Sequence, residues 1–172
     1  ITGIHHTDGL ADFADGLMVN GTKEKKLAAM KDISTGSAGI VTIVLYIVGL
    51  IIVISQSTGY QLFLSILLSE ILAKFSMVLM ASIGKSATLG SNSPFVELMK
   101  NKKKLVLASV ITLIPMIVLG GQTGLLVFGV GVTLTIFLVI LTAKSFGGIT
   151  GDVFGATNEL TRLASLLIFV SV

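Results

Sequence analysis

The sequence predicts an all-α fold, a polytopic transmembrane helical bundle of about five spans with an acidic helix at the membrane interface before the first span. Hydrophobic residues make up 53% of the 172 positions and charged residues only 12%. The mean hydropathy is +0.98, which is typical of integral membrane proteins and far from the values of soluble domains. Long apolar runs alternate with polar segments that hold most of the charges. We therefore expect residues 1–172 to form a single integral membrane domain.

The first stretch, residues 3–17, is predicted to be the acidic helix. At about 100° per residue, Asp8, Asp12 and Asp15 fall within a wedge of roughly 60° on one face. Like charges raise one another's pKa and repel, and no basic residue precedes Lys23, so a divalent cation would resolve the conflict. Oxygen ligands of this kind suit Mg²⁺ or Mn²⁺. The alternative is an amphipathic helix with a solvated acidic stripe.

His5 and His6 raise the question of a zinc site in the same stretch. Adjacent histidines point in different directions on a helix, and the chain has no third histidine and no cysteine. Zinc is therefore disfavoured. The lack of cysteine also excludes a disulfide framework, while the redox compartment stays open.

The first two spans follow a polar and basic segment, residues 20–37. Residues 38–55 form an uninterrupted apolar run that would cover about 27 Å as a helix. The second run, residues 60–83, carries Glu70 and Lys74 one helical turn apart. Ionisable groups at that depth pair or line a polar cavity, so the two side chains either form a salt bridge with each other or serve a site.

The later spans are expected at residues 105–119 and 124–142, joined by a chargeless turn at 120–123. A fifth apolar run begins near Leu160 and reaches Val172, which covers only about two thirds of the hydrocarbon core. We expect the C-terminus to be cut short or to bend along the interface. The chain begins without Met and without a signal peptide, so we also expect a truncated N-terminus.

Three loops are expected on one side of the membrane: residues 1–37, 84–104 and 143–159. They hold every loop charge, including a run of lysines, whereas the turns at 56–59 and 120–123 hold none. The positive-inside rule makes the charged side cytoplasmic, and the lysine run is expected to contact anionic lipid head groups. The sequence thus predicts a multi-pass protein of the cell membrane with its site facing the cytoplasm. Nucleic acid is not an expected partner, and the oligomeric state stays open.

The chemistry that fits is phosphoryl or nucleotidyl transfer at the membrane surface. Carboxylates that hold Mg²⁺ opposite lysines can neutralise a diphosphate and its transition state. One further acid could take a proton from an attacking hydroxyl, and Asp15 is a candidate. The glycines around Asp152 either let helices pack closely or let the backbone approach a phosphate.

Three motifs in this order resemble a known family. The first reads H-T-D-G-L-A-D at residues 6–12 and continues with D-G-L at 15–17. The second reads M-K-D at 30–32, followed by Gly36 and Gly39. The third reads G-G-I-T-G-D at 147–152, followed by G-A at 155–156 and N-E at 158–159. These motifs resemble the signatures of the cobalamin synthase family, the adenosylcobinamide-GDP ribazoletransferases, over nearly the whole chain.

The resemblance implies a membrane enzyme of the last steps of cobalamin biosynthesis. It would join adenosylcobinamide-GDP to α-ribazole, or to its 5′-phosphate, and release GMP with Mg²⁺ as cofactor. By position, the implied catalytic and metal-binding residues are Asp8, Asp12, Asp15 and Asp152. The implied substrate-binding residues are His6, Lys31, Asp32, Lys74, Lys85, Asn158 and Glu159.

The sequence departs from the family pattern in three places. The arginine expected in the second motif is replaced around residues 33–35, and Lys74 and Lys85 stand where relatives tend to carry arginines. Lysine keeps the positive charge but cannot bind a phosphate through two parallel hydrogen bonds as the guanidinium of arginine does. The apolar segment expected before the first motif is absent from the sequence.

Two other functions were weighed. A CDP-alcohol phosphotransferase also places several Asp on a helix at a membrane surface, but its motif has Arg after Ala where this chain has Asp12 after Ala11. A cation-coupled transporter would place Glu70 and the acids within spans and would show an internal repeat. Most of the acids here flank spans and no repeat is visible, so the sequence favours the transferase.

Overall fold

The computed structural model describes residues 4–87 and 93–172, so part of the predicted polar connection 84–104 lies outside the described residues. The described residues form helices with no β-sheet, as the composition predicted. The helices are α1 (Ile4–Met18), α2 (Lys23–Ala29), α3 (Ser37–Gln56), α4 (Gly59–Ile83), α5 (Ser93–Met99), α6 (Lys102–Ser145) and α7 (Gly151–Ser171).

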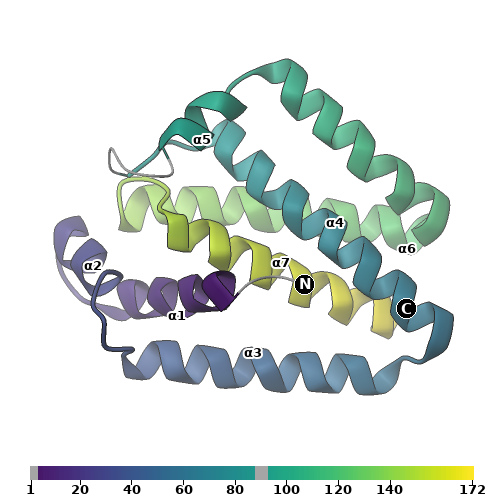
Figure 1. Ribbon diagram of the computed structural model, residues 1–172, viewed down its shortest axis with the longest axis horizontal. Coiled ribbons are helices and arrows are strands. Elements are labelled where there is room, and N and C mark those ends of the chain that lie inside the picture. The colour runs from purple at the N-terminus through teal and green to yellow at the C-terminus, as the bar shows by residue number, and fades with distance from the viewer. Residues whose placement is uncertain (1–3, 88–92) are drawn as a thin grey trace.

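Helix α7 lies at the centre of the bundle. It packs against α1, α4 and α6, while α3 packs mainly against α1 on the outside (Figure 1). In the most apolar part of α7, 67% of the residues are buried, against 17% in α3. The polar residues of α7 therefore face other helices, whereas α3 exposes a surface of Ile, Val and Leu that suits lipid.

Within the described residues, four helices are long and apolar enough to cross a membrane: α3, α4, α6 and α7. We expected about five spans, and the difference arises in α6. This helix has 44 residues and contains both the third and the fourth predicted run, with a break at Gly121 (φ 56°, ψ −136°). Figure 1 shows that α6 reverses its direction, so its two halves form separate legs that meet at the turn and diverge from it.

The reversal falls within the predicted turn at residues 120–123. Gly121 adopts a positive φ that side chains disfavour. A β-carbon at Gly124 would overlap the backbone carbonyl of Met116, so only glycine allows the second leg to start this close to the first. Pro115 lies within the first leg without ending it.

The expected boundary of the last span is wrong. Residues 143–159 do not form one long loop, because α7 begins at Gly151, and its 21 residues are enough for a crossing. Thr150 is the N-cap, and its side-chain oxygen accepts a hydrogen bond from the Val153 N–H at 3.3 Å. The polar residues that follow are helical and buried, so local hydropathy alone suggested a loop.

A short backbone pairing joins the segment after α4 to the segment before α7. The Ile149 N–H donates to the Lys85 carbonyl at 2.8 Å, and the Ala87 N–H donates to the Ile149 carbonyl at 2.9 Å. Ile149 itself is buried. This pairing fixes the start of α7 relative to the end of α4, at the same end of the bundle as α2 (Figure 1).

Candidate active site

Helix α1 forms the predicted acidic helix. Leu10 and Phe13 are buried in the core, and Phe13 packs against Phe146 with the ring centroids 5.9 Å apart. The opposite side of the helix leaves Asp8 exposed and Asp12 partly exposed. This amphipathic pattern holds α1 in the groove between α3 and α7 and turns its carboxylates outward.

The first and third motifs meet where α1 crosses the start of α7. A β-carbon added at Gly9 would lie 2.9 Å from the Cα atom of Asp152, and one added at Gly155 would lie 2.9 Å from the His6 carbonyl oxygen. Each helix therefore uses a glycine to bring its backbone against the other. The expected approach of Asp152 to the N-terminal acids is found in the structure.

The carboxylates on these two helices repel one another. Partial burial, followed by the charges of Asp8, Asp152 and Asp15, raises the pKa of Asp12 to about 6. Lys31 is exposed, and it lies close enough to Asp152 for its charge to act on that carboxylate. The cluster therefore has the excess of negative charge that a cation would relieve.

Asp15 has a contact that the sequence did not reveal. Its carboxylate oxygens accept hydrogen bonds from the Gly36 N–H at 2.7 Å and from the Gly39 N–H at 2.8 Å. These are N–H groups at the N-terminus of α3, where the backbone has no partner of its own. Asp15 thus caps α3 from the neighbouring helix, and the glycines of the second motif leave room for it.

The donor set fits Mg²⁺ only together with further oxygens. Among residues 4–87 and 93–172, no three Asp, Glu or His side chains are arranged to hold a metal ion by themselves. Mg²⁺ commonly takes one or two protein carboxylates and completes its shell with waters and substrate phosphates. Asp8, Asp12 and Asp152, which lie close enough for their charges to act on one another, could supply that smaller set.

Three of the expected substrate-binding residues, Lys74, Asn158 and Glu159, form a separate polar group inside the bundle. Lys74 Nζ donates to Asn158 Oδ1 at 2.8 Å, and Asn158 Nδ2 donates to Glu159 Oε1 at 3.1 Å. Glu159 is fully buried, and its other carboxylate oxygen accepts from the Tyr46 hydroxyl and, at 2.5 Å, from Arg162 Nη1. Glu159 therefore belongs to an interior network and does not join the outer carboxylates.

Of the two alternatives for Glu70 and Lys74, the mutual salt bridge is not found, since each side chain contacts a residue of α7. Glu70 Oε1 lies instead 2.6 Å from Arg162 Nε, because α4 turns Glu70 toward α7 while Lys74 reaches Asn158. Sequence reasoning missed Arg162 and Tyr46. Arg162 is the only arginine in the chain and follows Glu159 by three residues within an apolar run, which is a usable signal for a buried pair.

The remaining predicted residues lie at the edges of these two groups. His6 is 3.9 Å from Glu159, measured between Nδ1 and Oε1, and burial, helped by the charge of Lys74, lowers its pKa. Asp32 is exposed and accepts from the Ser34 N–H at 2.9 Å. Lys85 is exposed at the pairing with Ile149.

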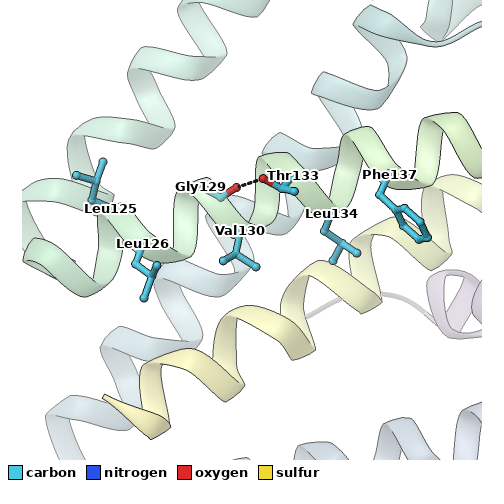
Figure 2. Close-up of a pocket in the computed structure, with 7 residues that line it drawn as sticks. All are labelled: Leu125, Leu126, Gly129, Val130, Thr133, Leu134 and Phe137. Carbon is cyan, nitrogen blue, oxygen red and sulfur yellow. Dashed lines mark hydrogen bonds between the residues drawn. The ribbon is translucent and has the colours of Figure 1, made fainter.

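Two grooves differ in what they offer to a substrate. A groove of about 630 Å³ lies on the second leg of α6. It is lined by residues such as Leu126, Val130 and Phe137 and by no charged side chain (Figure 2). Its composition suits lipid. A second groove, of about 440 Å³, runs between α1 and α3 and includes Asp8 and Thr35 in its lining. Of these two grooves, the second is the one whose lining includes a carboxylate of α1.

A multi-pass helical bundle that gathers carboxylates and lysine near one end defines a membrane protein with a site suited to phosphate chemistry. Comparison with known proteins specifies the family. The model of the family described as cobalamin-5-phosphate synthase matches residues 1–170. The chain belongs to this family, and it is a membrane transferase of cobalamin biosynthesis.

Curated relatives are named adenosylcobinamide-GDP ribazoletransferase. The protein from Methanocella arvoryzae is 34% identical over 96% of this chain and 68% of its own length. The protein from Pyrococcus abyssi is 34% identical, with 98% and 71% covered, and that from Thermococcus onnurineus is 36% identical, with 96% and 70% covered. No solved structure matches the chain. The family result agrees with the resemblance of the three motifs and rules against the transporter and CDP-alcohol alternatives.

Proposed function

We propose that the chain joins adenosylcobinamide-GDP to α-ribazole, or to its 5′-phosphate, and releases GMP. The observation that supports this most directly is the meeting of Asp8 and Asp12 with Asp152 at the crossing of α1 and α7. The acids come from motifs more than a hundred residues apart, and Asp8 lines the groove between α1 and α3. The names of the relatives supply the substrates.

The reaction is a transfer of a phosphoryl-linked group. A ribose hydroxyl of the acceptor attacks the phosphorus atom attached to the cobinamide, a new phosphorus–oxygen bond forms, and the bond to the GMP oxygen breaks. The hydroxyl proton passes to a base, and GMP leaves with the electron pair of the broken bond. Such transfers depend mainly on positioning and on electrostatic stabilisation of the phosphoryl oxygens.

Mg²⁺ is the cofactor that this donor set suits. When bound, it would neutralise diphosphate charge as a Lewis acid. Asp8, Asp12 and Asp152 would hold it, and the exposed Lys31 would face the phosphates from the second motif. Asp15 keeps α3, and with it the second motif, against α1.

We further propose that the site faces the cytoplasm at the cell membrane. The lysines of the segment 20–37, the run at 100–104 and Lys144 all belong to the loops expected on that side. Positive charge next to spans favours the cytoplasmic face.

The test is incubation of membranes that contain the protein with adenosylcobinamide-GDP and either α-ribazole or its 5′-phosphate. GMP and the corrinoid product are quantified with Mg²⁺ and with a chelator. We expect equal amounts of GMP and joined product, dependent on Mg²⁺, and no product from membranes with Asp12→Asn. GMP release without a joined corrinoid, or turnover unaffected by the chelator, would contradict the proposal.

A further inference from the structure

A group of four side chains ties three helices together in the interior of the bundle. We call Arg162, Glu159, Tyr46 and Glu70 the Arg162 network. Arg162 Nη1 donates to the Tyr46 hydroxyl at 3.0 Å and to Glu159 Oε2 at 2.5 Å, and its Nε lies 2.6 Å from Glu70 Oε1. One guanidinium on α7 therefore contacts both α3 and α4.

The charges of the network depend on one another. Glu159 has no exposed surface and Arg162 is only 9% exposed, so neither charge is stabilised by water. Removing one partner of a buried ion pair leaves an uncompensated charge and is strongly destabilising, whereas removing both is often tolerated. The position of Glu159 is thus set by Arg162 and Tyr46.

The network reaches α1 through Glu159. The second carboxylate oxygen of Glu159, Oε1, lies 3.9 Å from His6 Nδ1, a packing contact that is too long for a hydrogen bond, and the backbone of His6 packs directly on Gly155, one helical turn before Glu159. Helix α1 has only 15 residues and is not among the candidate spans, so its place is fixed by contacts with its neighbours. Glu159 packs beside one of these contacts, at His6, and His6 lies two residues before the first metal-ligand candidate, Asp8.

The network is remote from the reacting groups. Arg162 follows Asp152 by ten residues, which is about 15 Å along a helix, and its side chain is enclosed by Glu70, Glu159 and Tyr46. It therefore acts through other residues and does not touch the phosphates.

We propose that Arg162 is a positioning residue for the transfer reaction. Through Glu159 it fixes the N-terminal part of α1 against α7, and through Tyr46 and Glu70 it fixes α3 and α4 around them. The register of α1 on α7, and with it the placement of Asp8 and Asp12 next to Asp152, depends on this network. The inference rests on the proposed function only for its catalytic consequence.

The first experiment separates positioning from stability. Arg162→Met alone leaves the buried charge of Glu159 unpaired, so we expect little folded protein. The double variant Arg162→Met/Glu159→Gln removes the two most buried charges. Glu70 loses its arginine partner but its side chain is 29% exposed and keeps access to water, so we expect a melting temperature near that of the wild type. The kcat of the double variant should nevertheless be lowered at least about tenfold, because a displacement of about 1 Å is enough for such losses. KM for both substrates should change by less than about twofold.

Wild-type kcat in the folded double variant would overturn the proposal, since the network would then serve stability alone. A large rise in KM with unchanged kcat would also overturn it, because Arg162 would then contribute to substrate binding. If the double variant does not fold, Tyr46→Phe decides. This variant removes one hydroxyl from the network. We expect kcat to fall about threefold or more, because the helices that carry the carboxylates would shift as in the double variant. A normal kcat in Tyr46→Phe would overturn the proposal.

Thr135→Val is the matched control for Tyr46→Phe. Thr135 is fully buried in α6, and its hydroxyl donates at 2.8 Å to the Gly131 carbonyl of the same helix. Removing this hydroxyl therefore breaks no contact between helices. We expect unchanged kcat in this variant.

A second experiment needs no substrate and therefore stands if the proposed function fails. The chain has no cysteine, so spin labels on Met18→Cys and Leu167→Cys, both exposed, report the distance between α1 and α7. We expect the distance distribution to broaden or shift in the double variant and in Tyr46→Phe, but not in Thr135→Val. Identical distributions in all four proteins would overturn the positioning role even if no GMP is released by the wild type.

Discussion

Burial and neighbouring negative charges both raise the pKa of the Asp12 carboxyl. Its carboxyl is partly buried and faces the charges of Asp8, Asp152 and Asp15, so the ionised form is disfavoured in the protein without a cation. Perturbed carboxyl groups in a cleft are candidates for functional sites when a specific charge partner accounts for the shift. A bound cation would convert this repulsion into attraction.

Neutralising one of the outer acids should remove activity and leave the fold intact. Asp8→Asn and Asp12→Asn replace a carboxylate by an amide of the same size, and Asp8 is exposed, so little packing is lost. We expect GMP release to fall at least about a hundredfold, since metal charge stabilisation is worth several kcal/mol. Size-exclusion profile and melting temperature should stay normal. Lys102→Ala, in the exposed lysine run, is the control and should retain activity; normal turnover in both Asp variants would refute the assignment.

Protons should compete with Mg²⁺ at Asp12. Its pKa of about 6 lies above the usual value, so the protonated form gains as the pH falls from 7 toward 5. The apo protein should become more stable over this window because the repulsion is relieved, while Mg²⁺ binding should weaken. A melting-temperature titration with Mg²⁺ at pH 7.5 and 5.5 measures both effects. An equal Mg²⁺-induced rise at the two pH values in the wild type would show that Asp12 does not bind the ion.

At the scale of the helix, α1 is held by a cap on one side and by glycine packing on the other. Asp15 accepts from two N–H groups at the start of α3, and Gly9 touches the backbone of Asp152 on α7. The same short helix thus carries the reactive carboxylates and the contacts that place them.

The cap predicts that substitutions of Asp15 and of Asp12 affect stability and activity differently. Asp15→Ala leaves the N-terminus of α3 uncapped, which should cost about 1 kcal/mol and lower the melting temperature. Asp15→Asn keeps one acceptor oxygen and should be milder in both stability and activity. Stability and GMP release of the two variants are compared with Asp12→Asn. If Asp15→Asn is as inactive as Asp12→Asn while fully stable, Asp15 acts in the reaction and the cap is secondary.

The crossing of α1 and α7 predicts a strong effect of a single methyl group. In Gly9→Ala the new β-carbon would meet backbone atoms of Asp152 at 2.9 Å, which cannot move aside as a side chain can. The helices must separate, so kcat should fall at least about tenfold. Gly129→Ala in α6 is the matched control, since nothing lies within 4 Å of its added β-carbon. Equal kcat in the two variants would contradict the importance of this contact.

At the scale of the whole molecule, charge and apolar surface are arranged for a membrane. Exposed Ile, Val and Leu cover α3 and the first leg of α6, whereas every lysine except Lys74 lies in or beside a segment that joins the spans at the end where α7 begins. This asymmetry predicts the orientation of the entire bundle.

The orientation can be measured with single cysteines, because the wild-type chain has none. Lys102→Cys lies at the charged end, and Thr58→Cys lies in the chargeless turn between α3 and α4; both residues are exposed. In intact cells, a thiol reagent that does not cross membranes should label Thr58→Cys and spare Lys102→Cys. Permeabilised cells should show labelling of both. The reverse pattern would place the candidate site outside the cell.

Much of the fold follows from local sequence. Residues 38–55 and 60–83 are apolar runs of bilayer length, and α3 and α4 match them closely. The turn at 120–123 was also visible, because paired glycines interrupt an apolar run. The start of α7 was not visible in the sequence, since residues 151–159 are polar enough to suggest a loop. They are helical because Thr150 caps the helix and because neighbouring helices bury them.

The sequence by itself determined the membrane class, the acidic face of α1 and the family motifs, because composition and helical period are properties of single segments. Only the tertiary structure decided what each acid contacts. Asp8, Asp12 and Asp152 meet because two glycines let α1 and α7 approach, Asp15 turns to the N-terminus of α3, and Glu159 turns inward to Arg162. Such choices depend on the crossing and register of helices from distant parts of the chain, which no local pattern encodes.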